Sequence, residues 1–206
     1  MILQGLSGEV SKEANEELEI VYDSAQHLLS LINDVIDISR IEADQLEAYF
    51  EEVDLDEVLR EAVAAVSRDA EAKKLEIRTD FPESLSIISD RKRLLQCVLN
   101  LLNNAVKFTE DGVIELRATK EAGILKISVS DTGIGIKEED IPKLFTPFTR
   151  LDSPLKERTL GTGLGLYLTK KIMKGVFHGN IMVESRYGMG STFTLIIPVP
   201  PGAVVR

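Results

Sequence analysis

The chain has 206 residues, of which 44% are hydrophobic and 28% charged, and its formal net charge is −10. This composition is typical of a soluble globular protein, and no apolar run reaches the roughly 18 residues that a membrane span requires. The acidic balance argues against a nucleic-acid partner, which would need a basic patch. With one cysteine, Cys97, and two histidines, the chain cannot form an internal disulfide, and a Cys/His metal cluster is disfavoured.

The first segment is predicted to be one long helix. Residues 11–43 contain neither glycine nor proline, and their apolar residues recur at helical spacing. Such a helix would be roughly 50 Å long, more than one compact domain can cover. We therefore interpret residues 1–46 as part of a dimerising helical hairpin, with no membrane contact by this chain. The start, "MILQGLSGEVSKE", lacks the pattern of a signal peptide, so a cytoplasmic location is expected.

Residues 47–206 are predicted to form a second domain of mixed helices and strands. In chain order we expect a strand in "AYFEEVDL", a helix capped by Asp54 or Asp56, a strand in "LEIRTDF" and a helix from "ISDRKR" to Thr109. A hairpin of "GVIELRATK" and "ILKISVSD" follows, then a helix near "KEEDIPKLF", a helix from about Leu164, and strands in "NIMVESRYG" and "STFTLIIPVP". Because helix runs and strand runs are segregated, the fold class predicted is α+β, a two-layer sandwich.

The segment "NLLNNAVKFT" carries an unusual number of asparagines for a helix, since asparagine costs up to ~0.7 kcal/mol relative to alanine. Asn100, Asn104 and Lys107 fall at positions i, i+4 and i+7 and therefore share one face. Amide oxygens suit a hard cation such as Mg²⁺, and a lysine can meet phosphate. The alternative is an ordinary amphipathic surface helix.

A second motif, "SVSDTGIGI", follows a strand. Strand alternation places Asp131 on the same face as the apolar Ile127 and Val129. A carboxylate there is costly unless a donor satisfies it, and a purine amino group would do so. Gly133 and Gly135 would let the backbone approach a flat ligand closely. The alternative is a simple turn after a strand.

A third motif, "GTGLGLYLTKKIM", places Gly161, Gly163 and Gly165 directly before a helix. The free N–H groups at a helix start form an anion site, although the spacing is not that of a P-loop. The polar segment 153–159 before it is expected to be a lid. Arg150, at the base of this segment, is a candidate phosphate contact, with simple surface exposure as the alternative.

Taken in order, these segments resemble the ATP-binding catalytic domain of sensor histidine kinases, within the superfamily shared with gyrase-type ATPases and heat-shock chaperones. "NLLNNAVKFT" resembles the family's N box, "DTGIG" its first glycine box and "LFTPF" its F box. "GTGLGL" and "GMGST" resemble the second and third glycine boxes, and "LLSLINDVIDISRIEA" resembles the second helix of the phosphotransfer hairpin. The resemblance runs from about Asp54 to the end of the chain.

The resemblance implies ATP and Mg²⁺ as cofactors and a response regulator receiver domain as a partner. It implies that Asn104, assisted by Asn100, coordinates Mg²⁺. Lys107 and Arg150 would meet the phosphates, and Asp131 would accept the adenine amino hydrogen. The other nucleotide contacts that it implies are Gly133, Gly135, Ile136, Phe145, Gly161, Thr162, Gly163, Leu164, Gly165, Leu166 and Thr192.

Two departures from the family patterns sharpen the expected function. The ATPases and serine kinases of the superfamily hold a glutamate base at the position of Asn100, and an amide cannot take a proton, so a histidine acceptor is favoured. Neither His27 nor His178 is followed by the acidic residue of the phosphoacceptor motif. We therefore expect a truncated histidine kinase whose acceptor lies outside this chain. The alternatives are a nucleotide-binding interaction module without kinase activity and, disfavoured by Asn100, an ATPase.

Overall fold

The computed structural model of the chain describes residues 11–43, 45, 47–151 and 162–199. Its main sheet has the strand order β2-β4-β5-β7-β6. The strands are β2 (Glu76–Asp80), β4 (Val113–Glu121), β5 (Ile124–Asp131), β6 (Asn180–Arg186) and β7 (Gly190–Pro198). Strands β2 and β4 pair in parallel, and the other neighbours are antiparallel. A small antiparallel sheet joins β1 (Glu51–Asp54) to β3 (Ser86–Ser89).

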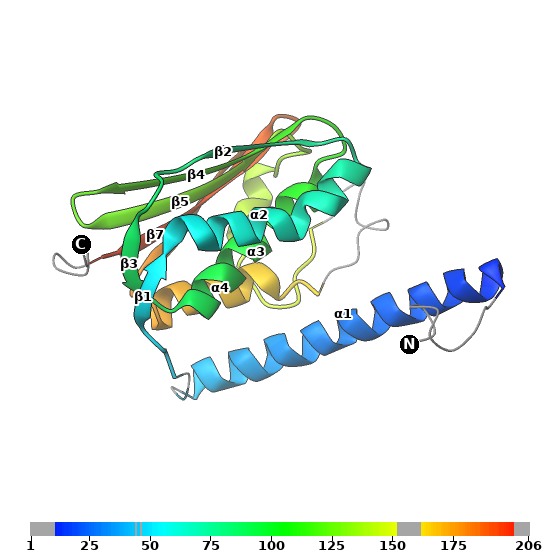
Figure 1. The fold of residues 1–206 in the computed structure, drawn as a ribbon, viewed down its shortest axis with the longest axis horizontal. Helices are drawn as coiled ribbons and strands as arrows, with labels where there is room; N and C mark the ends of the chain where they lie inside the picture. Colours follow the sequence, from blue (N-terminus) through cyan, green and yellow to red (C-terminus); the bar gives the residue numbers. More distant parts are fainter. Residues whose placement is uncertain (1–10, 44, 46, 152–161, 200–206) are drawn as a thin grey trace.

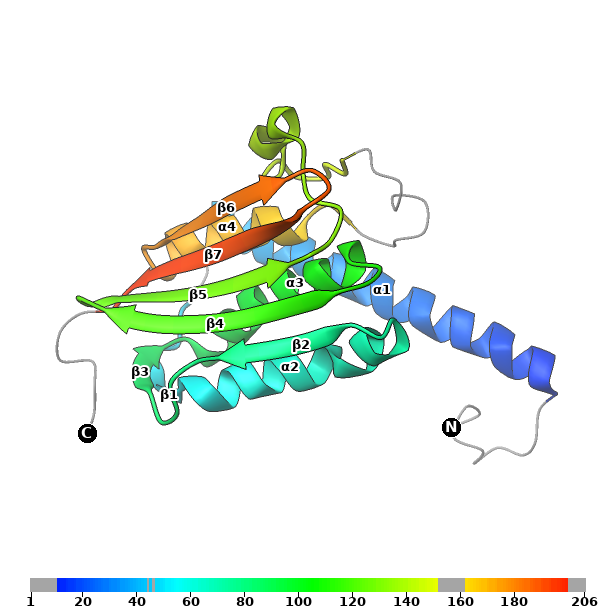
Figure 2. The ribbon, with the colours of Figure 1, turned by 90° about the horizontal axis from the view of Figure 1, so that it is seen from above.

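Three helices cover one face of the main sheet (Figures 1 and 2). They are α2 (Leu55–Ala72), α3 (Arg91–Phe108) and α4 (Gly165–Gly175), and a 3₁₀ helix, η1 (Glu138–Lys143), follows β5. Apolar side chains from both layers, such as Leu59, Leu101 and Ile127, are fully buried between them. The predicted two-layer α+β sandwich is therefore confirmed.

Side-chain caps fix where two of these helices begin. The Asp54 carboxylate accepts a hydrogen bond from the backbone N–H of Asp56 at 3.0 Å, so Asp54 is the cap of α2. The Asp90 carboxylate caps α3 by accepting from the N–H of Arg93 at 2.9 Å. Its other oxygen accepts from the N–H of Tyr49 at 3.0 Å, which ties the segment before β1 to the start of α3.

One predicted helix start needs correction, and the type of a second predicted helix can now be given. Ile88 and Ser89, expected to open the helix that ends at Thr109, belong to strand β3, and α3 begins only at Arg91. The helix expected near "KEEDIPKLF" is the 3₁₀ helix η1, which contains Pro142. Proline has no N–H to give to a helical hydrogen bond, and its ring clashes with the preceding turn, so this segment cannot continue as an α-helix.

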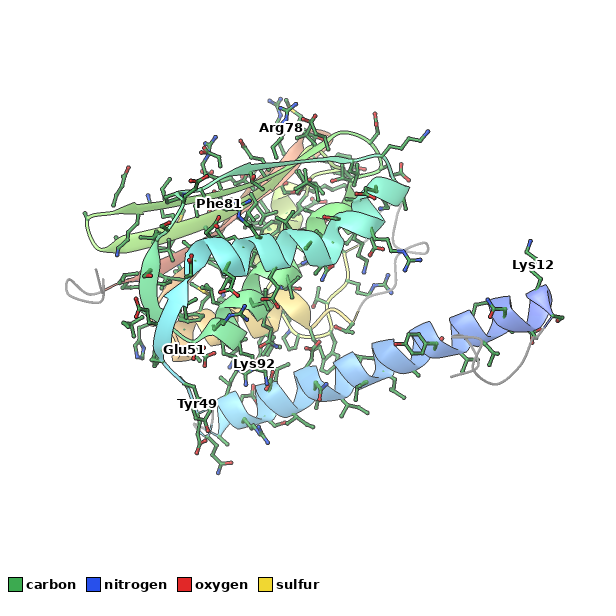
Figure 3. The ribbon with its side chains drawn as sticks, in the orientation of Figure 1. Lys12, Tyr49, Glu51, Arg78, Phe81 and Lys92 are labelled. Atoms are coloured by element: carbon green, nitrogen blue, oxygen red, sulfur yellow. The ribbon has the colours of Figure 1, made fainter. Side chains whose placement is uncertain are left out.

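Helix α1 (Lys12–Glu42) lies along the helical layer and projects beyond it, with Lys12 at the far end (Figures 1 and 3). Ile38 and Ile41, near its C-terminal end, pack against the core. Most of its apolar stripe is exposed, including Ile20, Val21, Tyr22, Leu28, Leu29, Ile32, Val35 and Ile36. None of the helices in the described ranges has the length and apolar character of a membrane span. That α1 forms part of a dimerising hairpin stays a prediction.

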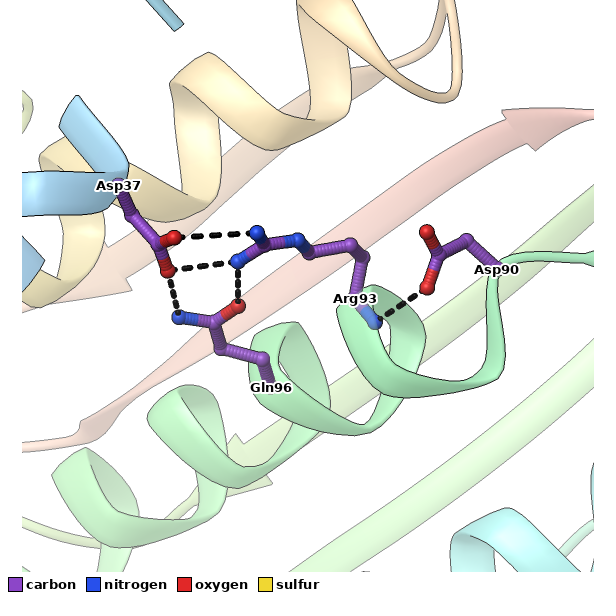
Figure 4. A network of polar contacts seen from close by, with 4 residues as sticks. All are labelled: Asp37, Asp90, Arg93 and Gln96. Carbon is purple, nitrogen blue, oxygen red and sulfur yellow. Dashed lines mark hydrogen bonds and ion pairs between the residues drawn. The ribbon is translucent and has the colours of Figure 1, made fainter. Parts of the chain in front are cut away.

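A polar network fastens α1 to α3 (Figure 4). The Arg93 guanidinium donates two hydrogen bonds to the Asp37 carboxylate, at 2.6 and 3.0 Å, and Gln96 donates a third at 3.2 Å. Burial raises the pKa of Asp37, but the bonds from Arg93 and Gln96 and the charge of Arg93 outweigh it, so the pKa lies below its usual value. Nearer the end of α1, the Tyr167 hydroxyl of α4 donates to Glu42 at 2.9 Å.

Candidate functional site

Helix α3 turns one polar face toward a cavity of about 320 Å³. Asn100, Asn104 and Lys107 all line this cavity, while Leu101 and Leu102 are buried in the core. Burial lowers the pKa of Lys107, and the nearby positive charge of Arg150 lowers it further. A phosphate placed between these two cations would reverse both effects, because it favours the charged form of an amine.

Asp131 ends strand β5 and lines the same cavity. It pairs with Ser191 of β7 and lies two residues after the buried Val129. Burial raises the pKa of Asp131, although the backbone N–H groups of Gly133 and Ser191 hydrogen-bond to it and lower the pKa in part. The Gly133 N–H donates at 2.9 Å. A half-buried carboxylate can accept further hydrogen bonds, so a ligand with an exposed N–H donor fits here.

The two glycines that follow Asp131 are each required by close backbone packing. A Cβ on Gly133 would lie 2.3 Å from the carbonyl oxygen of Phe108. Gly135 has a φ of +63°, and a Cβ there would lie 2.1 Å from the carbonyl oxygen of Arg186. These glycines therefore let the chain after β5 fold against the end of α3 and the β6–β7 turn. That packing shapes the wall of the cavity next to Asp131.

The N-terminus of α4 forms another part of the cavity wall. Leu164 is its N-cap residue, and no side chain caps the helix there. The Thr162 hydroxyl accepts from the N–H of Leu164 at 3.0 Å. Gly163 and Gly165 line the cavity with Thr162, so this helix start faces the space that Lys107 also lines. Backbone N–H groups at a helix start favour an anion in such a position.

Most of the predicted site residues lie around this one cavity. Those that line it are Asn100, Asn104, Lys107, Asp131, Gly135, Ile136, Arg150, Thr162, Gly163, Gly165 and Leu166. They come from α3, from the end of β5 and the segment after it, from the segment that follows η1, and from the residues around the start of α4. Spacing along the sequence placed them in separate motifs, and the fold brings them together.

Four predicted residues are described but do not line the cavity, namely Gly133, Phe145, Leu164 and Thr192. Leu164 is fully buried, and the Phe145 ring lies 5.0 Å from the Lys170 ammonium. The Thr192 hydroxyl hydrogen-bonds to Ser130 at 2.9 Å. That these four residues contact the nucleotide therefore stays a prediction. Gly161 and the predicted lid, 153–159, lie outside the described residues.

Sequence reasoning missed several residues that line the cavity, among them Asp34, Ile134, Lys137, Tyr187, Ser191 and Phe193. Ile134 and Phe193 carry a usable signal, because one stands between the two glycines after Asp131 and the other alternates with half-buried residues along β7. Asp34 carries none, since it belongs to α1 and reaches the cavity only because α1 docks on the body.

The residues present fit a hard divalent cation that arrives with phosphate. Within the described ranges, no group of three or more His, Cys, Asp or Glu side chains could hold a metal by itself. The neutral oxygen donors that α3 brings to the cavity are the amides of Asn100 and Asn104. Mg²⁺ is commonly held by one or two protein oxygens together with substrate phosphates and water, so this donor set suits a nucleotide-bound ion.

Comparisons with known proteins agree with this arrangement. Residues 89–201 match the family described as histidine kinase-, DNA gyrase B- and HSP90-like ATPases. Over 184 residues the chain is 41% identical to the non-motile and phage-resistance protein of Caulobacter vibrioides, covering 87% of this chain and 22% of that protein. Over 201 residues it is 37% identical to the circadian input-output histidine kinase CikA of Synechococcus elongatus, covering 96% of this chain and 26% of that protein.

A solved structure with the same fold is that of full-length ShkA in complex with AMPPNP. It superposes with a TM-score of 0.82 at 30% identity, over 98% of this chain and 42% of that one. The chain thus belongs to the histidine kinase-, DNA gyrase B- and HSP90-like ATPase family, and it corresponds to the ATP-binding catalytic domain of histidine kinases. It spans about a quarter of the length of the two curated relatives named above.

Proposed function

We propose that this chain binds ATP with Mg²⁺ and transfers the γ-phosphoryl group to a histidine supplied from outside its sequence. One observation carries the proposal, the convergence of an acceptor carboxylate, two amides and two cations on a single cavity, from Asp131, Asn100, Asn104, Lys107 and Arg150. The proposal includes a cytoplasmic location, as expected from the sequence, because ATP is available there.

Adenine would lie at the Asp131 end of the cavity. The exocyclic amino group of adenine donates hydrogen bonds, and the half-buried Asp131 carboxylate accepts them. Ile134 and Ile136 offer apolar contact to the ring. The hydrogen bond from the amino group would favour the charged carboxylate and so offset the desolvation that raises the Asp131 pKa in the nucleotide-free chain. This end of the cavity would thus select the base of the nucleotide by the direction of its hydrogen bonds as well as by its shape.

The triphosphate would lie toward Lys107, Arg150 and the start of α4. Both cations and the free N–H groups of the helix start favour negative charge there. Asn104, with Asn100 beside it, would hold Mg²⁺ through its amide oxygen. When bound, Mg²⁺ would supply positive charge that offsets the negative charge of the phosphates. The protein's own residues would then position the reacting groups and exclude water, as in other phosphoryl transfers.

The side chain at position 100 favours a histidine acceptor over water or serine. In the transfer, the bond between the γ-phosphorus and the bridging oxygen breaks, ADP leaves, and the lone pair of a neutral imidazole nitrogen forms the new bond to phosphorus. A neutral imidazole needs no base to become a nucleophile. His178 lies exposed in the turn after α4 and does not line the cavity, so it is badly placed to be the acceptor. The phosphorylated histidine would then pass the group to an aspartate of a response regulator.

The test supplies the missing acceptor. The chain is incubated with Mg²⁺ and γ-labelled ATP together with a helical hairpin that carries a phosphoacceptor histidine, beside the same hairpin with that histidine replaced by glutamine. The proposal predicts acid-labile label on the first hairpin and none on the second. Steady release of phosphate without labelled protein would instead establish an ATPase. Nucleotide binding with neither product would establish the alternative, an interaction module without kinase activity.

A further inference from the structure

Thr169 in α4 has a buried hydroxyl that packing alone does not explain. The residue is 2% exposed, and burying a hydroxyl costs free energy unless it is hydrogen-bonded. Its Oγ1 accepts a hydrogen bond from Nδ2 of Asn100 on α3, at 2.8 Å. Threonine is also a weaker helix former than alanine. The hydroxyl at this position therefore has a polar partner that belongs to the candidate site.

The Asn100 amide lies along one turn of α4, between Gly165 and Thr169. A Cβ on Gly165 would lie 2.2 Å from Oδ1 of Asn100 but 3.3 Å from its Nδ2. The carbonyl oxygen is therefore the end of the amide nearer Gly165, and the nitrogen is the end nearer Thr169. Gly165 lines the cavity and Thr169 does not. The amide oxygen thus lies at the cavity end of this contact and the amide nitrogen at the core end.

The direction of the contact between the two side chains follows from their chemistry. An amide nitrogen can only donate, and the Thr169 hydroxyl oxygen accepts from Nδ2 of Asn100. While Nδ2 is held in this way, Oδ1 stays at the end of the amide next to Gly165.

We propose that Thr169 is a positioning residue for the metal-binding amide, which it holds with the oxygen of Asn100 toward the cavity. This inference rests on the proposed function, in which Asn100 and Asn104 hold nucleotide-bound Mg²⁺. An amide that is free to turn presents its NH₂ group, a donor, to the cavity for part of the time, and a cation cannot use it. The fixed orientation would therefore strengthen binding of the nucleotide only when the metal is present.

The test compares ATP affinity with Mg²⁺ and with EDTA, by titration calorimetry, for the intact chain and for three variants. Thr169→Val and Thr169→Ala remove the hydroxyl, and Thr169→Ser keeps it. We expect Thr169→Val and Thr169→Ala to lower the Mg²⁺-dependent gain in ATP affinity by about threefold to tenfold, the effect of one ordinary hydrogen bond. Affinity in EDTA should stay unchanged, and Thr169→Ser should behave as the intact chain.

A double-mutant cycle checks that Thr169 acts through Asn100. In an Asn100→Ala background, Thr169→Val should have no further effect on the Mg²⁺-dependent gain, because the amide that it positions is gone. Equal loss of affinity with Mg²⁺ and with EDTA would overturn the inference in favour of simple packing, as would a Thr169→Ser variant that fails like the other two. An unchanged gain in Thr169→Val and Thr169→Ala would overturn it as well. If the intact chain shows no Mg²⁺-dependent ATP binding, the proposed function itself fails before the variants are compared.

Discussion

Apolar side chains are buried in the two-layer body but largely exposed on helix α1. In the body, Leu101 and Ile127 are at most 1% exposed, whereas Ile20 and Leu28 of α1 are 67% and 58% exposed. Burial of apolar area is the main source of folding free energy, so the body carries its own stability and α1 does not. One of the contacts that join α1 to the body is the ion pair between Asp37 of α1 and Arg93 of α3. The residues of the candidate nucleotide site belong chiefly to the body, and α1 carries an apolar stripe that the body leaves exposed.

The largest expected effect is a loss of stability of the two-layer body. Gly135→Ala places a Cβ at a φ of +63° and 2.1 Å from the carbonyl oxygen of Arg186. Left-handed strain and overpacking together should cost about 2–5 kcal/mol in the free energy of unfolding, measured by chemical denaturation. Gly188→Ala is the matched control, because Gly188 has a φ of +80° but no atom within 4 Å of its Cβ position. If both variants lose the same stability, the close contact at Gly135 has no energetic weight.

The next effect removes ligand binding while leaving the body folded. Asp131→Asn replaces an acceptor-only carboxylate by an amide, and it should weaken ATP binding by about 10- to 100-fold, the range for a hydrogen bond to a charged group. Fluorescence titration with a labelled adenine nucleotide measures this loss. Circular dichroism should show an unchanged fold. A variant that keeps full affinity would remove Asp131 from the adenine site.

The same substitution should change how stability depends on pH. Burial raises the folded-state pKa of Asp131 above its usual 3.8. A raised carboxyl pKa means that the folded chain holds this proton more tightly, so stability falls as pH rises from about 3.8 through the folded pKa and is then level. Asp131→Asn should therefore gain stability relative to the intact chain across that window in nucleotide-free buffer. A difference that is constant with pH would contradict the assigned desolvation.

A smaller effect should loosen α1 from the body. Arg93→Ala leaves the Asp37 carboxylate, which is 16% exposed, without its main partner. We expect a cost of about 1–3 kcal/mol, limited because α1 can separate and let Asp37 return to water. Faster hydrogen exchange in residues 31–42 with unchanged exchange in α2 would locate the loss. Arg117→Ala, which removes only exposed ion pairs, those with Asp80 and Glu115, is the control and should cost less than about 0.5 kcal/mol.

The Asp37 contact should also fail in acid. The pKa of Asp37 is held below its usual 3.8, so the stability that it contributes is complete above that value and is lost as pH falls through the folded-state pKa. The protection factors of α1 amides, which correct for the pH dependence of intrinsic exchange, should fall through this range in the intact chain. In Asp37→Asn these protection factors should already be low at neutral pH and should change little on acidification.

The smallest effect on the nucleotide site is expected from the exposed stripe of α1. Leu28→Glu and Ile32→Glu change side chains that are 58% and 48% exposed, so they should leave ATP affinity within about twofold. They should, however, reduce self-association if α1 forms a dimer through this face, as its apolar character suggests. Light scattering coupled to gel filtration measures the mass. A dimer that survives both changes would place its interface elsewhere.

Periodicity predicted much of the fold, because long amphipathic segments leave few alternatives. The spacing of Asn100, Asn104 and Lys107 and the strand alternation that reaches Asp131 both correspond to side chains around one cavity. Strand β3 was missed because Ile88 and Ser89 run almost directly into α3, so the sequence does not separate the two elements. The helix predicted near "KEEDIPKLF" is present, although the sequence does not give its 3₁₀ type. Asp34 and Thr169 could not be found from the sequence at all. Their importance depends on contacts with α3 and the cavity across more than 60 residues of chain.

The central claim, that this cavity holds ATP with Mg²⁺ through Asp131 and the amides of α3, is tested most directly by calorimetric titration of the intact chain with ATP and with GTP in Mg²⁺. The account predicts saturable binding of one ATP per chain. It also predicts at least about tenfold weaker binding of GTP, whose ring carbonyl would face the Asp131 carboxylate as one acceptor against another. Equal affinity for the two nucleotides, or no saturable binding of ATP, would contradict it.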